Sequence, residues 1–218
     1  MEIKVNNIIL NYTQSGKGYP VILLHGNGED LHIFDKLTEK LKQHYTVYAI
    51  DSRNHGGSSK TDDYSYETVV EDIYHFIKQM KLEHVAVIGF SDGAIISLLL
   101  QLKYENIFDK LVLLGVNLKP DDFKEEIYGY LVEEYEKTKD PLVKMMLEQP
   151  QIELEELKRI NVPTLVVAAE DDIYYRKNFT DIAETIPHAV LKIMQGHDHS
   201  SYIVNEDILY ADLVQFLQ

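Results

Sequence analysis

The sequence predicts an α/β fold in which helices flank a mainly parallel central sheet. Short apolar runs that do not alternate with polar residues recur along the chain, as in strands that are buried on both faces. Segments with an apolar residue at every third or fourth position, typical of amphipathic helices, separate these runs. Polar clusters directly follow several runs, at the strand ends where such sheets carry their sites.

Each element follows from its local pattern. Residues 3–13 alternate in pieces around Asn6-Asn7, which predicts an N-terminal hairpin. The buried strands are expected at the apolar runs 21–24, 46–50, 85–90, 111–116, 164–169 and 190–194. The helices are expected at 33–43, 66–80 and 95–104. Strands joined through helices form right-handed crossovers, so the sheet should be mainly parallel.

One segment breaks the alternation of strand and helix. Residues 118–160 have no strand pattern, but helical patterns cover 123–137, 142–147 and 154–159. From Asp121 to Glu156 the chain has twelve acidic residues and four lysines. We interpret this segment as a small helical cap inserted into a core formed by residues 1–117 and 161–218. The alternative is a solvated connector without substrate contact.

The overall composition limits the function. The chain of 218 residues has a formal net charge of −15, which disfavours binding to nucleic acid or anionic membranes. It contains no cysteine, which removes disulfides and thiolate metal sites and fits a reducing compartment. We expect a cytoplasmic protein that acts on a small molecule without a cofactor. The oligomeric state is not predicted.

The segment Gly89-Phe90-Ser91-Asp92-Gly93 has the pattern of a nucleophile elbow. It lies between a strand pattern and an apolar helix pattern, so Ser91 is expected at the apex of a tight turn. The glycines on either side let the two backbones pass closely. The following helix N-terminus offers amide hydrogens to a developing oxyanion.

With four further landmarks, the sequence resembles the α/β-hydrolase superfamily over essentially its whole length. The landmarks are the segments His25-Gly26-Asn27-Gly28 and 51–58, an acid after the strand at 164–169, and a histidine after the last strand. The Gly-x-Ser-Asp-Gly elbow is loosely similar to that of valacyclovir-hydrolase-like enzymes. The resemblance implies the α/β-hydrolase fold and a Ser-His-Asp triad.

The family spacing selects the other triad members. In the family frame, Asp172 is the acid in preference to its neighbour Asp171, and His199 is the base in preference to His197. Glu170 would support the acid loop. The pair His197 and His199 could instead bind a metal, but the landmarks of metal hydrolases are missing, so no metal site is predicted.

The resemblance also implies an oxyanion hole formed by the backbone N–H groups of Asn27 and Asp92. His25 either contacts substrate or braces its loop, and family members favour the brace. Arg53 and His55 are expected to connect loops. The Asp92 carboxylate either favours substrates with an ammonium group or hydrogen-bonds neighbouring loops, and both interpretations remain open.

The expected function is that of a serine hydrolase that cleaves a small carboxylic ester, amide or thioester through an acyl-serine intermediate. A carbon–carbon bond hydrolase, a cofactor-free haloperoxidase or a lyase would use the same triad. Residues of the cap decide between these reactions, so the triad alone does not distinguish them. Two non-catalytic alternatives are a member of the fold that only binds a small ligand and an interaction module that docks through its acidic cap.

Overall fold

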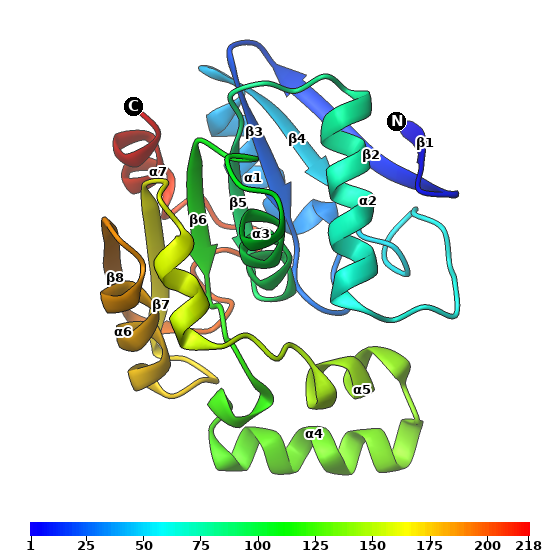
Figure 1. Ribbon diagram of the computed structural model, residues 1–218, viewed down its shortest axis with the longest axis vertical. Coiled ribbons are helices and arrows are strands. Elements are labelled where there is room, and N and C mark those ends of the chain that lie inside the picture. Colours follow the sequence, from blue (N-terminus) through cyan, green and yellow to red (C-terminus); the bar gives the residue numbers. More distant parts are fainter.

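The computed structural model of the chain describes all 218 residues, and its centre is an eight-stranded sheet (Figure 1). The strands are β1 (Glu2–Val5), β2 (Ile8–Gly16), β3 (Tyr19–Leu24), β4 (Tyr45–Ile50), β5 (Ala86–Phe90), β6 (Lys110–Leu114), β7 (Thr164–Asp171) and β8 (Ala189–Asp198). Their order in the sheet is β1-β2-β4-β3-β5-β6-β7-β8. Only the pairs β1–β2 and β2–β4 are antiparallel. The predicted α/β fold is confirmed.

The N-terminal hairpin forms where it was predicted. Strands β1 and β2 pair with Val5 opposite Ile8. The turn residues Asn6 and Asn7 both have positive φ angles, 42° and 64°. Two-residue hairpin turns need this left-handed conformation, which asparagine tolerates better than most residues.

Helices cover both faces of the sheet. One face carries α1 (Asp35–Leu41) and α7 (Tyr210–Leu217), and the other carries α2 (Tyr66–Gln79), α3 (Asp92–Lys103) and α6 (Arg176–Thr185). Successive residues of β3 point to opposite faces, as strand geometry requires. Ile22 packs in the cluster with Phe76 of α2, whereas Leu23 packs in the cluster with Leu37 of α1. No helix is long and apolar enough to cross a membrane.

Several elements differ in extent from their predictions, and neighbouring contacts explain the difference in three of them. The helix expected at 33–43 is a 3-10 helix, η1 (Leu31–Phe34), followed by α1. The Asp30 side chain accepts a hydrogen bond from the His32 N–H and so begins this turn earlier. Strands β7 and β8 continue to Asp171 and Asp198, because their pairing resumes after a register shift at Ala169.

The segment between β6 and β7 consists of η2 (Pro120–Asp122), α4 (Glu125–Thr138), α5 (Pro141–Glu148) and η3 (Leu154–Arg159). Helices α4 and α5 lie together beyond one end of the sheet, below it in Figure 1. Two hydrogen bonds join them to loops at the carboxyl ends of strands: Lys124 N donates to Ile173 O, and Asn27 Nδ2 donates to Leu142 O. The 3-10 helix η3 instead packs against α3 and α6.

Candidate active site

Ser91 lies at the turn between β5 and α3 in a strained conformation. Its φ and ψ angles are 50° and −115°, a region that non-glycine residues rarely adopt. A β-carbon on Gly89 would lie 2.2 Å from the Gly93 carbonyl oxygen, and one on Gly93 would lie 2.0 Å from the Leu24 carbonyl oxygen. Only glycine fits at both positions. The tight turn expected from the elbow pattern is therefore present.

His199 connects Ser91 to Asp172 through hydrogen bonds. His199 Nε2 is 3.2 Å from Ser91 Oγ, and His199 Nδ1 is 2.7 Å from Asp172 Oδ1. Because an ionised carboxylate only accepts, Nδ1 carries the proton and Nε2 is left to accept from the serine hydroxyl. The Ala169 N–H donates to Asp172 Oδ2 at 3.0 Å and fixes the carboxylate. The three predicted triad residues are thus brought together.

The neighbouring candidates point elsewhere. The Asp171 side chain is 85% exposed and pairs with Lys124 at 3.0 Å. His197 Nδ1 lies 3.2 Å from the Ser201 hydroxyl, whereas the Ser91 hydroxyl bonds His199. Glu170 Oε2 accepts from the Gly196 N–H at 2.8 Å, which joins the acid loop to the histidine loop. Asp172 and His199, and not Asp171 and His197, therefore form the hydrogen-bond chain to Ser91, while their roles as acid and base stay predictions.

The imidazole of His199 is held in place by contacts that the motifs did not indicate. Its ring centroid lies 5.0 Å from that of Phe90 and 5.5 Å from that of the buried Tyr174. Gly115, which follows β6 and has a φ of 60°, faces the same ring, and a β-carbon there would lie 2.5 Å from His199 Cε1. The sequence showed Gly115 only as a glycine after an apolar run, without its partner.

Two backbone N–H groups beside Ser91 are available to bind an anion. Asp92 is the first residue of α3, and the N–H group at this helix position has no intrahelical partner. The Asn27 N–H lies in the loop after β3 and donates to no other backbone group. Asn27 lines the same cleft as Ser91 and His199. Asn27 thus lines the cleft with Ser91, and Asp92 directly follows Ser91 in the chain, while the oxyanion hole itself stays a prediction.

The Asp92 side chain is buried and already has two partners. Tyr66 Oη donates to its Oδ1 at 2.7 Å, and Asn27 Nδ2 donates to its Oδ2 at 3.0 Å. Burial raises the pKa of Asp92, and these hydrogen bonds act in the opposite direction. The Asp92 carboxylate thus hydrogen-bonds neighbouring segments, and its effect on substrates with an ammonium group stays a prediction.

His25 forms the same kind of internal connection. It is 1% exposed, with Nδ1 at 2.8 Å from Gly26 O, and its Nε2 accepts from the Ser52 N–H at 3.1 Å. Both ring nitrogens are therefore occupied, and burial lowers the pKa of His25 to about 4, which keeps the ring neutral. His25 thus hydrogen-bonds its own loop and the loop after β4. His55 supports the same loop, because its Nε2 accepts from the Gly28 N–H at 3.1 Å.

A cleft of about 170 Å³ opens onto Ser91 and His199. Nine residues line it: Gly26, Asn27, Glu29, Phe90, Ser91, Met146, Ile173, His199 and Ser200. Met146 comes from α5, so the segment between β6 and β7 contributes to the wall. Glu29 was not predicted as a site residue. Its Oε2 accepts from the Gly26 N–H at 2.9 Å, and burial raises the pKa of its carboxyl to about 7.

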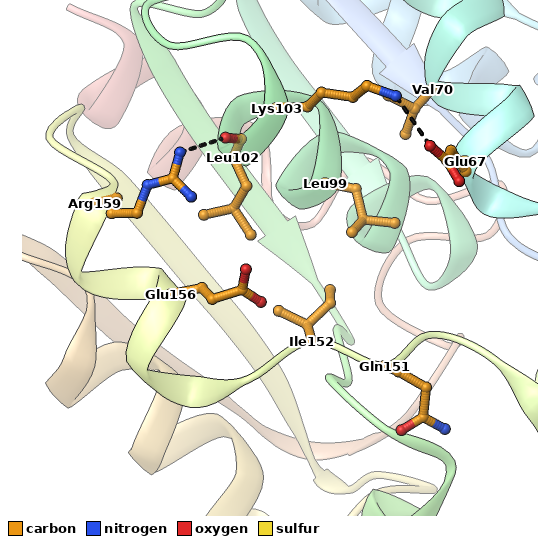
Figure 2. A pocket seen from close by; sticks show the side chains of 9 residues that line it. All are labelled: Glu67, Val70, Leu99, Leu102, Lys103, Gln151, Ile152, Glu156 and Arg159. Carbon is orange, nitrogen blue, oxygen red and sulfur yellow. Dashed lines mark hydrogen bonds and ion pairs between the residues drawn. The ribbon is translucent and has the colours of Figure 1, made fainter.

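A larger pocket of about 480 Å³ lies between α2, α3 and η3 (Figure 2). It adjoins the C-terminal part of α3, whereas Ser91 precedes the first residue of that helix. Its two basic side chains already have partners, since Lys103 pairs with Glu67 and Arg159 donates to Leu102 O. This pocket is separate from the Ser91 cleft.

This combination of fold and site defines an α/β hydrolase. The family model for the alpha/beta hydrolase fold matches residues 19–143 of the chain, more than half of its length. The chain therefore belongs to the α/β-hydrolase family, as its motifs indicated.

Several curated proteins are similar to part of the chain. Human serine hydrolase BPHL is 32% identical over 135 residues, 58% of this chain and 46% of that protein. Ethanol acetyltransferase 1 of Kluyveromyces lactis is 39% identical over 93 residues, 41% of this chain and 25% of that protein. A 2-hydroxy-6-oxo-6-(2'-aminophenyl)hexa-2,4-dienoic acid hydrolase of Metapseudomonas resinovorans is 30% identical over 118 residues, 52% and 41% respectively. The chain spans less than half the length of each of these relatives.

Solved structures match the whole chain in fold. The enol-lactonase from Burkholderia xenovorans LB400 superposes with a TM-score of 0.84 over 100% of this chain and 99% of that chain, at 18% identity. A meta-cleavage product hydrolase from Pseudomonas fluorescens IP01 superposes with a TM-score of 0.83 over 99% and 96%, at 20% identity. At these identities the match concerns the fold alone.

Proposed function

We propose that the chain is a serine hydrolase that cleaves a small carboxylic ester, amide or thioester without a cofactor. The observation that carries this proposal is the hydrogen-bond chain from Ser91 through His199 to Asp172, which opens onto a cleft. The family membership and the name of the human relative support a hydrolytic enzyme.

Each group has a distinct role in the proposed reaction. His199 Nε2 takes the proton of Ser91 as Oγ attacks the carbonyl carbon, and Asp172 stabilises the imidazolium that forms. The N–H groups of Asn27 and Asp92 bind the tetrahedral oxyanion. His199 then gives its proton to the leaving group. Water, deprotonated by His199, attacks the acyl-serine and releases the acid.

The direct test is a panel of p-nitrophenyl esters with acyl chains of increasing length, assayed with wild type and Ser91→Ala. Wild type should hydrolyse at least the short esters, and the variant should lose about 10³-fold or more in kcat. Equal rates in the two proteins would disprove the proposal. Folded wild type that cleaves no ester and does not react with a fluorophosphonate probe would favour a non-catalytic, ligand-binding protein.

Acyl transfer to an alcohol is a second candidate, and the similar proteins named ethanol acetyltransferase favour it. In this reaction an alcohol takes the place of water and attacks the acyl-serine, which yields a new ester. Adding ethanol to a p-nitrophenyl acetate assay separates the two outcomes. Ethyl acetate formed in proportion to p-nitrophenol indicates transfer, whereas acetate alone indicates hydrolysis.

Carbon–carbon bond hydrolysis is a third candidate, because one similar curated protein is named for a substrate of the hexadienoic acid class. The same triad would act, with a carbon rather than an oxygen as the leaving atom. The test compares kcat/KM for a vinylogous 1,5-diketone with kcat/KM for the best ester of the panel. A higher value for the diketone indicates carbon–carbon bond hydrolysis, and a higher value for the ester indicates ester hydrolysis.

A further inference from the structure

Glu29 is an acidic side chain that the proposed mechanism does not use, and it lies inside the reactive cleft. It belongs to the loop between β3 and η1. Glu29 Oε2 and Ser91 Cβ lie 2.8 Å and 3.1 Å from the point where a β-carbon on Gly26 would stand. The carboxylate is therefore close to the atom that would attack substrate.

No positive side chain neutralises this carboxylate. Its hydrogen bond in the protein is to the Gly26 N–H, and none of the residues that line the cleft is a lysine or an arginine. The ionisable groups that face it are His199, Asp92 and Asp30. The Asp92 carboxylate accepts hydrogen bonds from Tyr66 and Asn27. Glu29 is therefore the carboxylate of the cleft wall that has no side-chain partner.

A half-buried carboxylate in such a wall acts on the charge of whatever binds there. Interactions between charges are stronger in a partly dehydrated cleft than in water. A cationic substituent on a bound molecule would replace water near Glu29 and gain this attraction. A carboxylate substituent would be repelled, and a neutral substituent would feel little of either effect.

We propose that Glu29 is a specificity-determining residue that makes the cleft prefer substrates with a cationic group near the scissile bond and reject substrates with an anionic one. The part of this inference that concerns reaction rates rests on the proposed function. The recognition itself is a property of binding and does not require the reaction.

The kinetic test uses two matched series at pH 8, where a carboxyl of pKa about 7 is ionised. One series contains p-nitrophenyl esters whose acyl chains end in a trimethylammonium, a methyl or a carboxylate group. The other contains thioacetates of cationic, neutral and anionic thiols. The ratio of kcat/KM for the cationic and neutral members of a series removes effects that act on all substrates equally.

In wild type, the cationic member should exceed the neutral member and the anionic member should fall below it, in at least one series. Glu29→Gln should lower the cationic-to-neutral ratio by about tenfold. Glu29→Asp, which keeps the charge, should restore part of it. The matched control Glu39→Gln removes a glutamate whose side chain is 68% exposed, and it should leave every ratio unchanged. Ratios in Glu29→Gln that equal those of wild type in both series would overturn the inference.

A binding measurement keeps this test independent of catalysis. Calorimetric titration of Ser91→Ala with the uncleavable methyl ketone analogues of the first series gives three dissociation constants. Adding Glu29→Gln should weaken binding of the cationic analogue by about tenfold and strengthen that of the anionic one. If the chain cleaves no ester, the proposed function fails and this titration still decides the role of Glu29. Equal affinities for the three analogues in the Glu29-containing protein would contradict it.

Discussion

At the scale of single residues, the choice between adjacent acids and adjacent histidines is the most specific claim. Asp172 bonds His199 from a buried position, whereas Asp171 is exposed and pairs with Lys124. Asp172→Asn should lower kcat on a short ester by about 10⁴-fold, because the wrong tautomer of His199 would face Ser91. Asp171→Asn should stay within twofold of wild type. Steady-state kinetics of the two variants decide this. A larger loss of kcat in Asp171→Asn than in Asp172→Asn would reverse the assignment.

Gly115 contacts the ring of His199, and we expect activity to depend on its having no side chain. An alanine β-carbon there would lie 2.5 Å from His199 Cε1, and the positive φ of 60° adds strain. Gly115→Ala should therefore displace the imidazole and lower kcat by about 10²-fold or more. A control is Gly129→Ala in α4, where a β-carbon would meet nothing within 4 Å. Unchanged kcat in Gly115→Ala would show that the histidine loop adapts.

The raised pKa of Glu29 also predicts how stability depends on pH. Burial raises this pKa to about 7 from the usual value near 4.5, so the folded protein binds the proton more tightly than the unfolded chain. Its contribution to stability is fully present below pH 4.5 and decreases as pH rises through 7. Glu29→Gln should therefore be more stable than wild type at pH 8, by about 1–2 kcal/mol, and equal to it near pH 4.5. Urea unfolding at the two pH values measures this difference.

The same ionisation should control charge preference. The cationic-to-neutral rate ratio should rise as pH increases from 6 to 8, because Glu29 loses its proton in this range. His199, Asp92 and Asp30 are the other ionisable groups that face Glu29, and effects that act on both substrates equally cancel in the ratio. In Glu29→Gln, the ratio should not change with pH. A pH-dependent ratio in that variant would assign the effect to another group.

At the scale of elements, the loop after β4 depends on a buried ion pair with α2. Arg53 Nε and Nη2 donate to Asp72 at 2.5 Å and 2.8 Å, and Asn6 Nδ2 donates to the same carboxylate at 2.8 Å. Asp72→Ala would leave the buried guanidinium without its partner, so it should lower the free energy of unfolding by about 3–5 kcal/mol. Asp63, which is 46% exposed and 3.5 Å from Arg53, provides the control. Asp63→Ala should cost less than about 1 kcal/mol.

The elements that sequence predicted well are those with a strong local pattern. The strands and the helix α2 follow from apolar runs and helical spacing, which reflect burial on both faces or on one. The extension of β7 and β8 depends on pairing that resumes after a bulge, and no local pattern shows this. No helix was predicted after His199, although Leu209 just before α7 and Leu213 and Leu217 within it recur at helical spacing.

The site divides in the same way. Ser91, Asp172 and His199 could be chosen because family motifs fix their spacing. Glu29 and Gly115 could not be chosen from the sequence. Glu29 bonds the backbone of its own loop at Gly26, which lies beside Ser91, and Gly115 contacts His199 from a loop that is distant in sequence. A single glutamate in a polar loop gives no signal until the fold places it beside the serine.

At the scale of the whole molecule, the sheet brings three separate loops together at the carboxyl ends of its parallel strands. Parallel strands β5, β7 and β8 all end there, so Ser91, Asp172 and His199 meet although Ser91 and His199 are 108 residues apart. Helix α5 contributes Met146 to the cleft from the segment between β6 and β7. The arrangement predicts a covalent intermediate on one defined hydroxyl group.

The most direct measurement is the mass of the protein after reaction with a fluorophosphonate, followed by mapping of the modified peptide. The account predicts one adduct per chain, located on Ser91, absent in Ser91→Ala and strongly slowed in His199→Gln. The matched variant His197→Gln should react like wild type. An adduct on another residue, or unchanged labelling of folded Ser91→Ala, would contradict the account.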